Sequence, residues 1–197
     1  MTDQASPDID IDDFSNSTTI DHPYFPATVG SILTYQVETE DGLEEIVVEV
    51  TAETRNVMGI ECVVIRDTVT LDGVLIEDTY DWFAQDNDGN VWYMGEAVEN
   101  YHYDDDGALI EIDHEGAWEA GVDGAQPGIQ MLAMPRVGDS YRQEYLEGEA
   151  EDLAAIKHLA FDITLANGDS YTTIRVKEWN PLEEDSLEYK YYAEGIG

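Results

Sequence analysis

Three carboxylates and one imidazole are the side chains of this sequence best suited to chemistry, because hairpin turns would align them. They are Asp67, Asp78, Glu99 and His114. A two-residue turn fixes which residues of two antiparallel strands lie opposite each other. Such turns are expected at Asp72-Gly73, Asp88-Gly89 and Asp106-Gly107. The first two would align Asp67 with Asp78, and Asp78 with Glu99. The third would align Glu99 with His114, which completes one row across four strands.

The predicted row falls on the more apolar face of the sheet. Side chains alternate between the two faces of a strand, and the residues that alternate with the row include many Val, Ile, Tyr and Trp side chains. Five aromatic residues on this face are expected to line a cavity: Tyr80, Trp82, Tyr93, Tyr101 and Trp118. The row is therefore predicted to point inward.

Carboxylates that are buried side by side repel each other, and both burial and a like-charged neighbour raise their pKa. A shared proton, a protonated His114 or a metal ion could relieve the repulsion. Two or three carboxylates with one histidine suit Ca²⁺, Mn²⁺, Fe²⁺ or Zn²⁺. Without metal, an acid–base pair is the alternative. The row could also lie at a hydrated barrel mouth and have no function.

The positions of the strands follow from runs rich in Val, Ile, Thr and Tyr that Asp-Gly or Asn-Gly turns separate. About ten strands are expected, at residues 31–40, 43–54, 60–71, 74–87, 90–105, 108–119, 140–149, 155–166, 169–179 and 186–193. Successive hairpins make an antiparallel up-and-down meander. Because an open meander of this size would leave exposed edges, the all-β chain should curl into a barrel or a strongly curled half-barrel.

Two segments depart from this pattern. Residues 1–20 are acidic and polar, and they are expected to form a flexible tail before a single domain at 21–197. Residues 120–139 read as an apolar loop that either covers one end of the barrel or moves as a lid. Arg136 and Arg142 lie near the end of this loop. They could contact an anionic ligand or neutralise nearby carboxylates.

The net charge excludes several classes of partner. The chain has 45 Asp and Glu residues against 8 Lys and Arg residues, a formal net charge of -37. Such a surface repels nucleic acid and anionic membranes. It suits a salty milieu, such as a marine or halophilic one, or a cation-rich extracellular setting. No glycine-rich nucleotide motif is present, so a nucleotide cofactor is not expected.

The start of the chain lacks the basic and apolar regions of a signal peptide, and no run is apolar enough for a transmembrane helix. A secreted or otherwise extracytoplasmic location, with the leader absent from this chain, is one expectation, and the cytoplasm of a halophile is the other. The single cysteine, Cys62, lies within a predicted strand and should be a buried, inert thiol. The oligomeric state is left open.

Four segments carry a resemblance: residues 21–26 (DHPYFP), 81–93 (DWFAQDNDGNVWY), 118–128 (WEAGVDGAQPG) and 188–197 (EYKYYAEGIG). They resemble uncharacterised bacterial secreted or envelope proteins, and the last segment is similar to the final strand of lipoprotein-like half-barrels. The resemblance implies a β-barrel fold and an extracytoplasmic origin, and it implies no activity. The lipid-attachment cysteine of such lipoproteins is missing here.

Three functional hypotheses follow. The first is a β-barrel that binds a small molecule or a cation, with the acidic row fixing the ligand. The second is a structural or interaction domain of a secreted or halophilic protein. The third is a lyase, isomerase or hydrolase in which Asp78 or Glu99 acts as base and His114 as acid or metal ligand.

The charge imbalance makes a prediction about salt. Added NaCl should screen the repulsion between surface carboxylates, so the melting temperature should rise steeply between about 0.01 and 1 M NaCl. Thermal unfolding followed by circular dichroism measures this. A melting temperature that stays flat over that range would contradict the argument.

Overall fold

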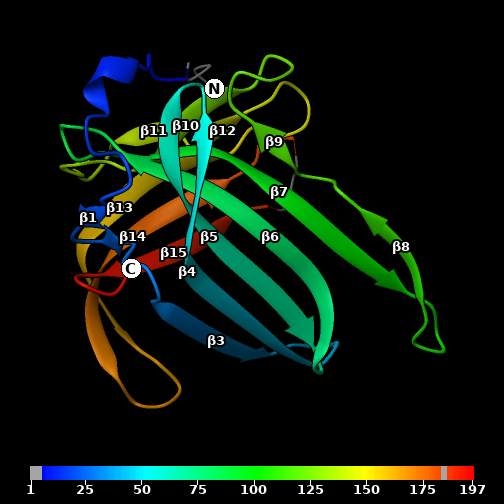
Figure 1. The fold of residues 1–197 in the computed structure, drawn as a ribbon. Helices are drawn as coiled ribbons and strands as arrows, with labels where there is room; N and C mark the ends of the chain where they lie inside the picture. The colour runs from blue at the N-terminus through cyan, green and yellow to red at the C-terminus, as the bar shows by residue number, and fades with distance from the viewer. Residues whose placement is uncertain (1–5, 183–185) are drawn as a thin grey trace.

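Two antiparallel sheets face each other in a computed structural model of the chain, which describes residues 6–182 and 186–197. The strands of the larger sheet are β3 (Ile32–Glu38), β4 (Leu43–Val57), β5 (Ile60–Leu71), β6 (Val74–Gln85), β7 (Val91–Tyr103), β8 (Leu109–Asp113), β9 (Trp118–Glu119), β10 (Gln126–Met131) and β12 (Glu144–Tyr145) (Figure 1). Those of the smaller sheet are β11 (Ser140–Arg142), β13 (Leu153–Thr164), β14 (Ser170–Trp179) and β15 (Glu188–Ala193). The described residues contain no α-helix.

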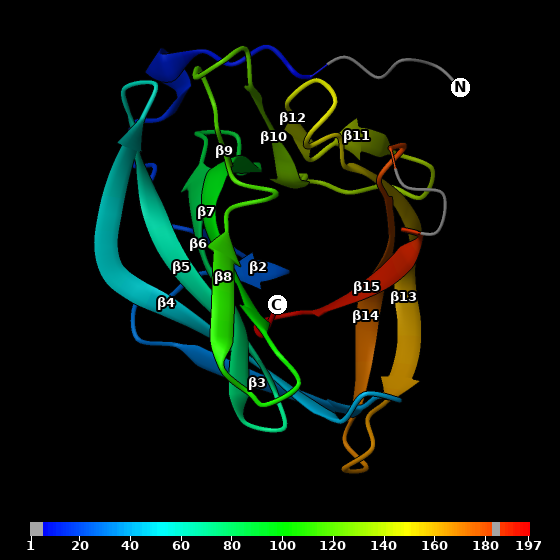
Figure 2. The same ribbon diagram turned by 90° about the vertical axis from the view of Figure 1, so that its right-hand side faces the viewer.

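The larger sheet is a strongly curled half-barrel. Its strand order is β12-β10-β7-β6-β5-β4-β3, and both β8 and β9 also pair with β7. The smaller sheet has the order β11-β13-β14-β15. Figure 2 shows β13–β15 facing the half-barrel across an interior, with β10–β12 at one end. The predicted all-β, antiparallel, curled architecture is therefore confirmed.

The predicted turns occur where expected, but their lengths differ. Asp72 and Gly73 both have positive φ angles, 49° and 80°, as a type I′ turn requires. A second turn of this kind, Met58-Gly59, joins β4 to β5 with φ angles of 52° and 90°. The loops around Asp88-Gly89 and Asp106-Gly107 are longer, because β6 pairs with β7 only from Gln85 and Val91, and β7 with β8 only from Tyr103 and Leu109.

Apolar side chains from both sheets form one core. The half-barrel contributes residues such as Val50, Ile65 and Phe83, and the smaller sheet contributes Ile156 and Val176. The short hairpin of β1 (Asp21–His22) and β2 (Phe25–Pro26) packs onto this core through the tilted pair of rings Phe25 and Phe83, whose centroids are 5.0 Å apart. The chain that follows β15 lies beside this hairpin, since the Gly195 N–H donates to the Pro23 carbonyl at 2.7 Å.

The predicted loop at 120–139 is wrong in its central part, which is strand β10. This strand pairs with both β7 and β12 and so belongs to the half-barrel. Its Pro and Gly content suggested a loop, yet Gly128 is required by a close approach. A Cβ at Gly128 would lie 2.2 Å from the backbone oxygen of Gln143. The central part of the segment is therefore a strand of the half-barrel and not a separate lid.

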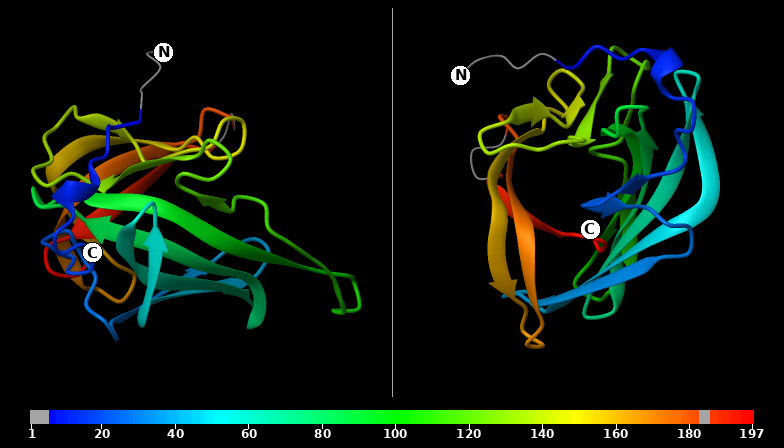
Figure 3. Two further views of the ribbon diagram at one scale, coloured as in Figure 1. Left: turned by 45° about the horizontal axis from the view of Figure 1, so that its top comes forward. Right: turned by 90° about the vertical axis from the view of Figure 1, so that its left-hand side faces the viewer.

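The described part of the predicted flexible tail, residues 6–20, contacts the half-barrel. A short 3₁₀ helix, η1 (Ile11–Asp13), is capped by Asp10, which accepts from the Asp12 N–H. The Ser17 hydroxyl donates to the Glu61 carbonyl at 2.6 Å, and Ile20 is buried. Figure 3 shows this segment crossing one end of the sheets. Residues 1–5 lie outside the described residues.

The close approach at Gly128 makes a prediction about stability. Gly128→Ala should lower the melting temperature, because the two backbones cannot separate without loss of the pairing between β10 and β12. Overpacking of this kind costs about 1–3 kcal/mol, or roughly 2–4 °C per kcal/mol in a chain of this size.

Gly73→Ala is the matched control. A Cβ there meets nothing within 4 Å, so only its positive φ of 80° disfavours the change, by about 1 kcal/mol. Equal melting temperatures for wild type and Gly128→Ala would contradict the close approach.

Candidate functional site

Register irregularities in the half-barrel decide which acidic residues face the interior. A shift between Val69 and Thr70 places Asp67 opposite Thr79 instead of Asp78. A second shift, between Trp82 and Phe83, pairs Phe83 with Tyr93 but Trp82 with Gly95. Each bulge adds one residue to a strand and reverses the alternation beyond it.

The four residues of the predicted row consequently do not lie side by side, and the prediction that all of them face inward is wrong. Asp78 does lie opposite Glu99, as predicted. These two side chains share the outer face, however, because Asp81 is three residues from Asp78 and faces inward. Asp67 alone faces inward, toward the smaller sheet. Burial, followed by the charge of Glu77, raises the pKa of Asp67 to about 6, and the charge of Lys190 opposes part of this shift.

The outward pair is neutralised locally. Arg66 donates from Nε and Nη2 to the two carboxylate oxygens of Asp78, at 2.8 and 2.7 Å. Its guanidinium also lies 5.5 Å from the centre of the Tyr80 ring. Glu99 is exposed and accepts a hydrogen bond from the Tyr101 hydroxyl at 2.6 Å. Neither carboxylate needs a further cation.

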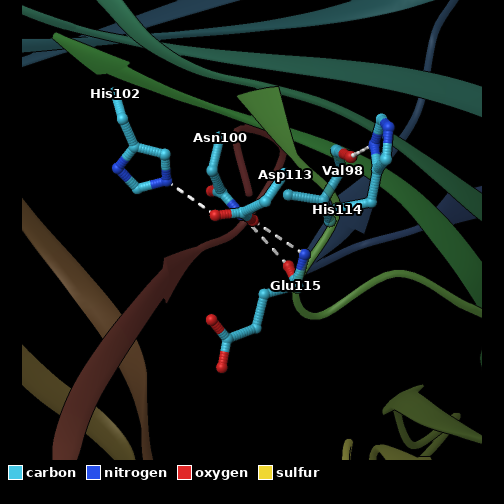
Figure 4. Close-up of polar contacts among 6 residues, drawn as sticks. All are labelled: Val98, Asn100, His102, Asp113, His114 and Glu115. Carbon is cyan, nitrogen blue, oxygen red and sulfur yellow. Dashed lines mark hydrogen bonds and ion pairs between the residues drawn. The ribbon is translucent and has the colours of Figure 1, made fainter. Parts of the chain in front are cut away.

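The predicted fourth member of the row, His114, points away from the other polar groups nearby (Figure 4). The pairing of Asn100 with Asp113 keeps the predicted register, but β8 ends at Asp113, before His114. The His114 Nδ1 lies 2.6 Å from the Val98 carbonyl. The structure therefore does not bring His114 into an acidic cluster.

His102 has the better-oriented imidazole. Its Nε2 lies 2.6 Å from Asp113 Oδ2, while Asp113 Oδ1 accepts from Asn100 Nδ2 and the Glu115 N–H, both at 2.9 Å. The Glu115 N–H, Asn100 and His102 together lower the pKa of Asp113 to about 2. His102 is not among the candidate residues that the sequence suggested.

Asp81 and Glu96 form the centre of the interior acidic group. They lie opposite each other on β6 and β7. The Tyr93 hydroxyl donates to Asp81 Oδ1 at 2.5 Å. Burial raises the pKa of Asp81 to about 7, with the charge of Asp67 adding to the shift and the Tyr93 hydrogen bond opposing it. Burial, followed by the charge of Asp81, raises the pKa of Glu96 to about 8.

Two further carboxyls come from the segment between the sheets. Glu144, on β12, is 7% exposed. Burial is the main cause of its strongly raised pKa, and Glu96 and Asp152 raise it further. Glu144 Oε2 and Asp152 Oδ1 are both buried without a hydrogen-bond partner among the described residues. The Trp118 indole N–H, which also has no well-aligned acceptor, lowers the pKa of Glu96 and Glu144.

The smaller sheet supplies one cation beside this acidic group, Lys190, whose side chain is 49% exposed. Lys190 Nζ lies 2.9 Å from Glu178 Oε2 and 3.4 Å from Glu188 Oε1. Desolvation lowers the pKa of Lys190, but the two carboxylates outweigh it and raise the pKa overall. Glu178 also accepts from Gln143 Nε2 and the Tyr192 hydroxyl, both at 3.3 Å. Lys190 is therefore already committed to its own pair of carboxylates.

Several of these groups line a cavity of about 470 Å³, called the acidic cavity below. Its lining residues are Tyr93, Glu96, Gln130, Gln143, Glu144, Asp152, Glu178, Trp179, Asn180, Ser186, Glu188 and Lys190. An adjoining hollow of about 640 Å³ shares Glu96, Glu144 and Asp152, and extends to His102 and Asp113. Among the lining residues that the structure describes, five carboxyls thus accompany one ammonium group.

The predicted aromatic lining is found only in part. Tyr93 lines the acidic cavity, and Trp118 contacts its carboxyls. Tyr101 reaches the adjoining hollow. Trp82 is on the outer face beneath Arg55, 3.9 Å from the ring centre, and Tyr80 is on that face beneath Arg66.

The two arginines of the predicted loop have local partners. Arg136 is exposed on a turn and its backbone N–H donates to Asp139. Arg142 is 4% exposed, and its Nη1 lies 4.0 Å from Glu151 Oε2. Its guanidinium lies 4.6 Å from the Tyr145 ring centre. For Arg142 these contacts favour the neutralising role over contact with an anionic ligand.

Comparisons with known proteins give no match from which a function could be inferred. No protein-family model, curated protein or solved structure matches the chain. Within residues 6–182 and 186–197, no three His, Cys, Asp or Glu side chains are grouped as metal ligands. No helix in the same ranges is long and apolar enough to span a membrane.

The raised pKa values make a prediction about pH. The folded pKa of Glu96, about 8, lies above the 4.5 of a free glutamic acid. The native state therefore binds more protons than the unfolded state between these values, and stability falls as pH rises through this window. Glu96→Gln should match wild type at pH 5 and melt about 4 °C or more higher at pH 8.5.

Thermal melts at constant ionic strength measure this difference. Glu53→Gln, at an exposed position of the same charge, serves as the control and should follow the wild-type curve. Parallel curves for wild type and Glu96→Gln would show that Glu96 is not a buried acid.

Proposed function

We propose that the chain is a binding protein for a small organic cation, such as a protonated amine, held in the acidic cavity. The observation that carries the proposal is the excess of carboxyls over ammonium groups in the described lining. Glu178 and Glu188 already pair with Lys190, whereas Glu96, Glu144 and Asp152 have no cationic partner among the described residues. A buried charge without a partner is expensive, and the group takes up a proton unless a cation is supplied. A bound ammonium would supply that cation.

The size and chemistry of the cavity favour an organic cation over a metal ion. A volume of about 470 Å³ lies in the range of small-molecule sites and far exceeds one ion. Tyr93 and Trp179 add aromatic rings to the lining, and ring faces attract ammonium groups. The predicted Ca²⁺, Mn²⁺, Fe²⁺ or Zn²⁺ lacks a group of three ligands in the described part of the chain.

Protons and the ligand would compete for the same carboxyls. Asp81 and Glu96, with pKa values of about 7 and about 8, are mostly protonated at mildly acidic pH. An amine keeps its charge up to about pH 10. Binding of an amine should therefore release protons and become tighter as pH rises from 5 to 8.

Titration calorimetry with n-butylamine tests the proposal. Butylamine should bind about tenfold or more tightly at pH 8 than at pH 5, whereas neutral n-butanol should not bind. Glu96→Gln and Glu144→Gln should each weaken butylamine binding about tenfold, the loss of one charge-assisted contact.

Glu99→Gln is the matched control, because Glu99 has the same charge on the outer face of the same strand. Equal losses in the control and in Glu96→Gln would indicate general attraction to the acidic surface and overturn the proposal. One tightly held equivalent of metal, measured by mass spectrometry on protein purified without chelator, would instead support the divalent-cation hypothesis.

A further inference from the structure

A second cavity of about 530 Å³ lies beside the acidic one and is mainly apolar. The residues that matter here are Leu33, Val48, Val50, Ile65, Tyr192 and Ile196. They come from β3, β4, β5 and β15, and from the segment after β15. No Asp, Glu, Lys or Arg is among the described residues that line it. We call it the apolar cavity.

The two cavities share one row of side chains across the half-barrel. Val50 pairs with Ile65, Ile65 with Asp81, and Asp81 with Glu96. Val50 and Ile65 line the apolar cavity, while Glu96 lines the acidic one. Neighbouring strands are about 4.8 Å apart, so this row passes from aliphatic to acidic over about 14 Å.

Tyr192 joins the cavities on the opposite wall. Its side chain lines the apolar cavity. Its hydroxyl donates to Glu178 Oε1 and accepts from Gln130 Nε2, at 3.3 and 3.2 Å. Glu178 and Gln130 both line the acidic cavity. The hydroxyl end of one ring therefore meets the acidic cavity, and the ring itself meets the apolar one.

We infer that the ligand is an amphiphilic amine, with its ammonium group in the acidic cavity and an alkyl chain in the apolar cavity. This inference rests on the proposed function. The row gives the ligand a direction, because the carboxyl of Glu96, at one end of the row, attracts the ammonium group, and Ile65 and Val50, at the other end, contact the alkyl chain. The aliphatic side chains of Val48, Val50 and Ile65 offer no hydrogen bond, which favours a hydrocarbon chain over a polar one.

The alkyl chain of the ligand should add affinity through the hydrophobic effect. Each buried methylene is expected to tighten binding about fourfold. Calorimetry at pH 8 with ethylamine, butylamine, hexylamine and octylamine measures this series, with n-octanol as the neutral probe. The dissociation constant should fall about fourfold per methylene along the amines, and octanol should bind far more weakly than octylamine.

Two variants fill the apolar cavity. Val48→Trp places a large ring within it, and Ile196→Trp does so from the half-exposed segment after β15, where folding tolerates change more readily. Both should leave ethylamine binding unchanged and abolish the gain from longer chains. Val137→Trp, at a 63% exposed loop position, is the control and should retain the chain-length dependence.

The outcomes separate the inference from the proposed function. Amines of every length that bind equally, with Glu96→Gln weakening them all, would overturn the inference and leave the proposed function standing. Octylamine and octanol that bind equally, with no effect of Glu96→Gln, would overturn both. If the affinity still increases with alkyl-chain length in Val48→Trp and Ile196→Trp, the alkyl chain binds outside the apolar cavity, and the inference is overturned.

Discussion

Repulsion between buried carboxyls is the interaction around which the interior is arranged. Asp81 and Glu96 face each other on adjacent strands, and Glu144 approaches them from β12. The surrounding groups each offset part of this repulsion. Tyr93 donates to Asp81, and the Trp118 N–H lies close enough to Glu96 and Glu144 to lower the pKa of both. These neighbours do not offset all of the repulsion, so the carboxyls bind protons at a higher pH than free carboxyls do.

The bulge in β7 makes this arrangement sterically feasible. Tyr93 and Glu96 are three residues apart, so a regular strand would send them to opposite faces. Trp82 pairs with Gly95 and Phe83 with Tyr93, so Met94 is the extra residue of β7, and it returns both Tyr93 and Glu96 to the interior. Gly95 permits the contact with β9, because a Cβ there would lie 2.5 Å from the Trp118 carbonyl. One glycine and one bulge thus bring the indole to the acidic side chains.

Much of the fold could be predicted from the sequence, because its main signals are local. Asp-Gly and Asn-Gly turns mark the hairpins, and the predicted strands at 60–71 and 169–179 nearly coincide with β5 and β14. The alignment of Asp78 with Glu99 is also confirmed. Strand β10 was missed because Pro127 and Gly128 are typical of loops, and the need for glycine at position 128 comes from the close approach of the Gln143 backbone, which the sequence does not reveal.

The site could not be predicted, because bulges leave no trace in a pattern of alternation. On β6 the alternating residues that include Tyr80 and Trp82 are the more apolar ones, and they were predicted to face the interior. In the structure that face is covered by Arg66 and Arg55, whose guanidinium groups lie over these rings. The more polar set, with Asp81, faces inward. Polarity alone therefore pointed to the wrong face, since long cationic side chains can cover aromatic rings on an outer surface.

The exposed and the buried carboxylates would act at different stages of binding. The net charge of -37 creates a long-range field that concentrates cations near the surface, and salt screens this field. The buried carboxyls are screened far less, and protons control their charge instead. Salt should then govern how fast a cationic ligand arrives, and pH how tightly it is held. The acidic surface and the acidic cavity would then have separate roles in the rate and the strength of binding, although both consist of Asp and Glu residues.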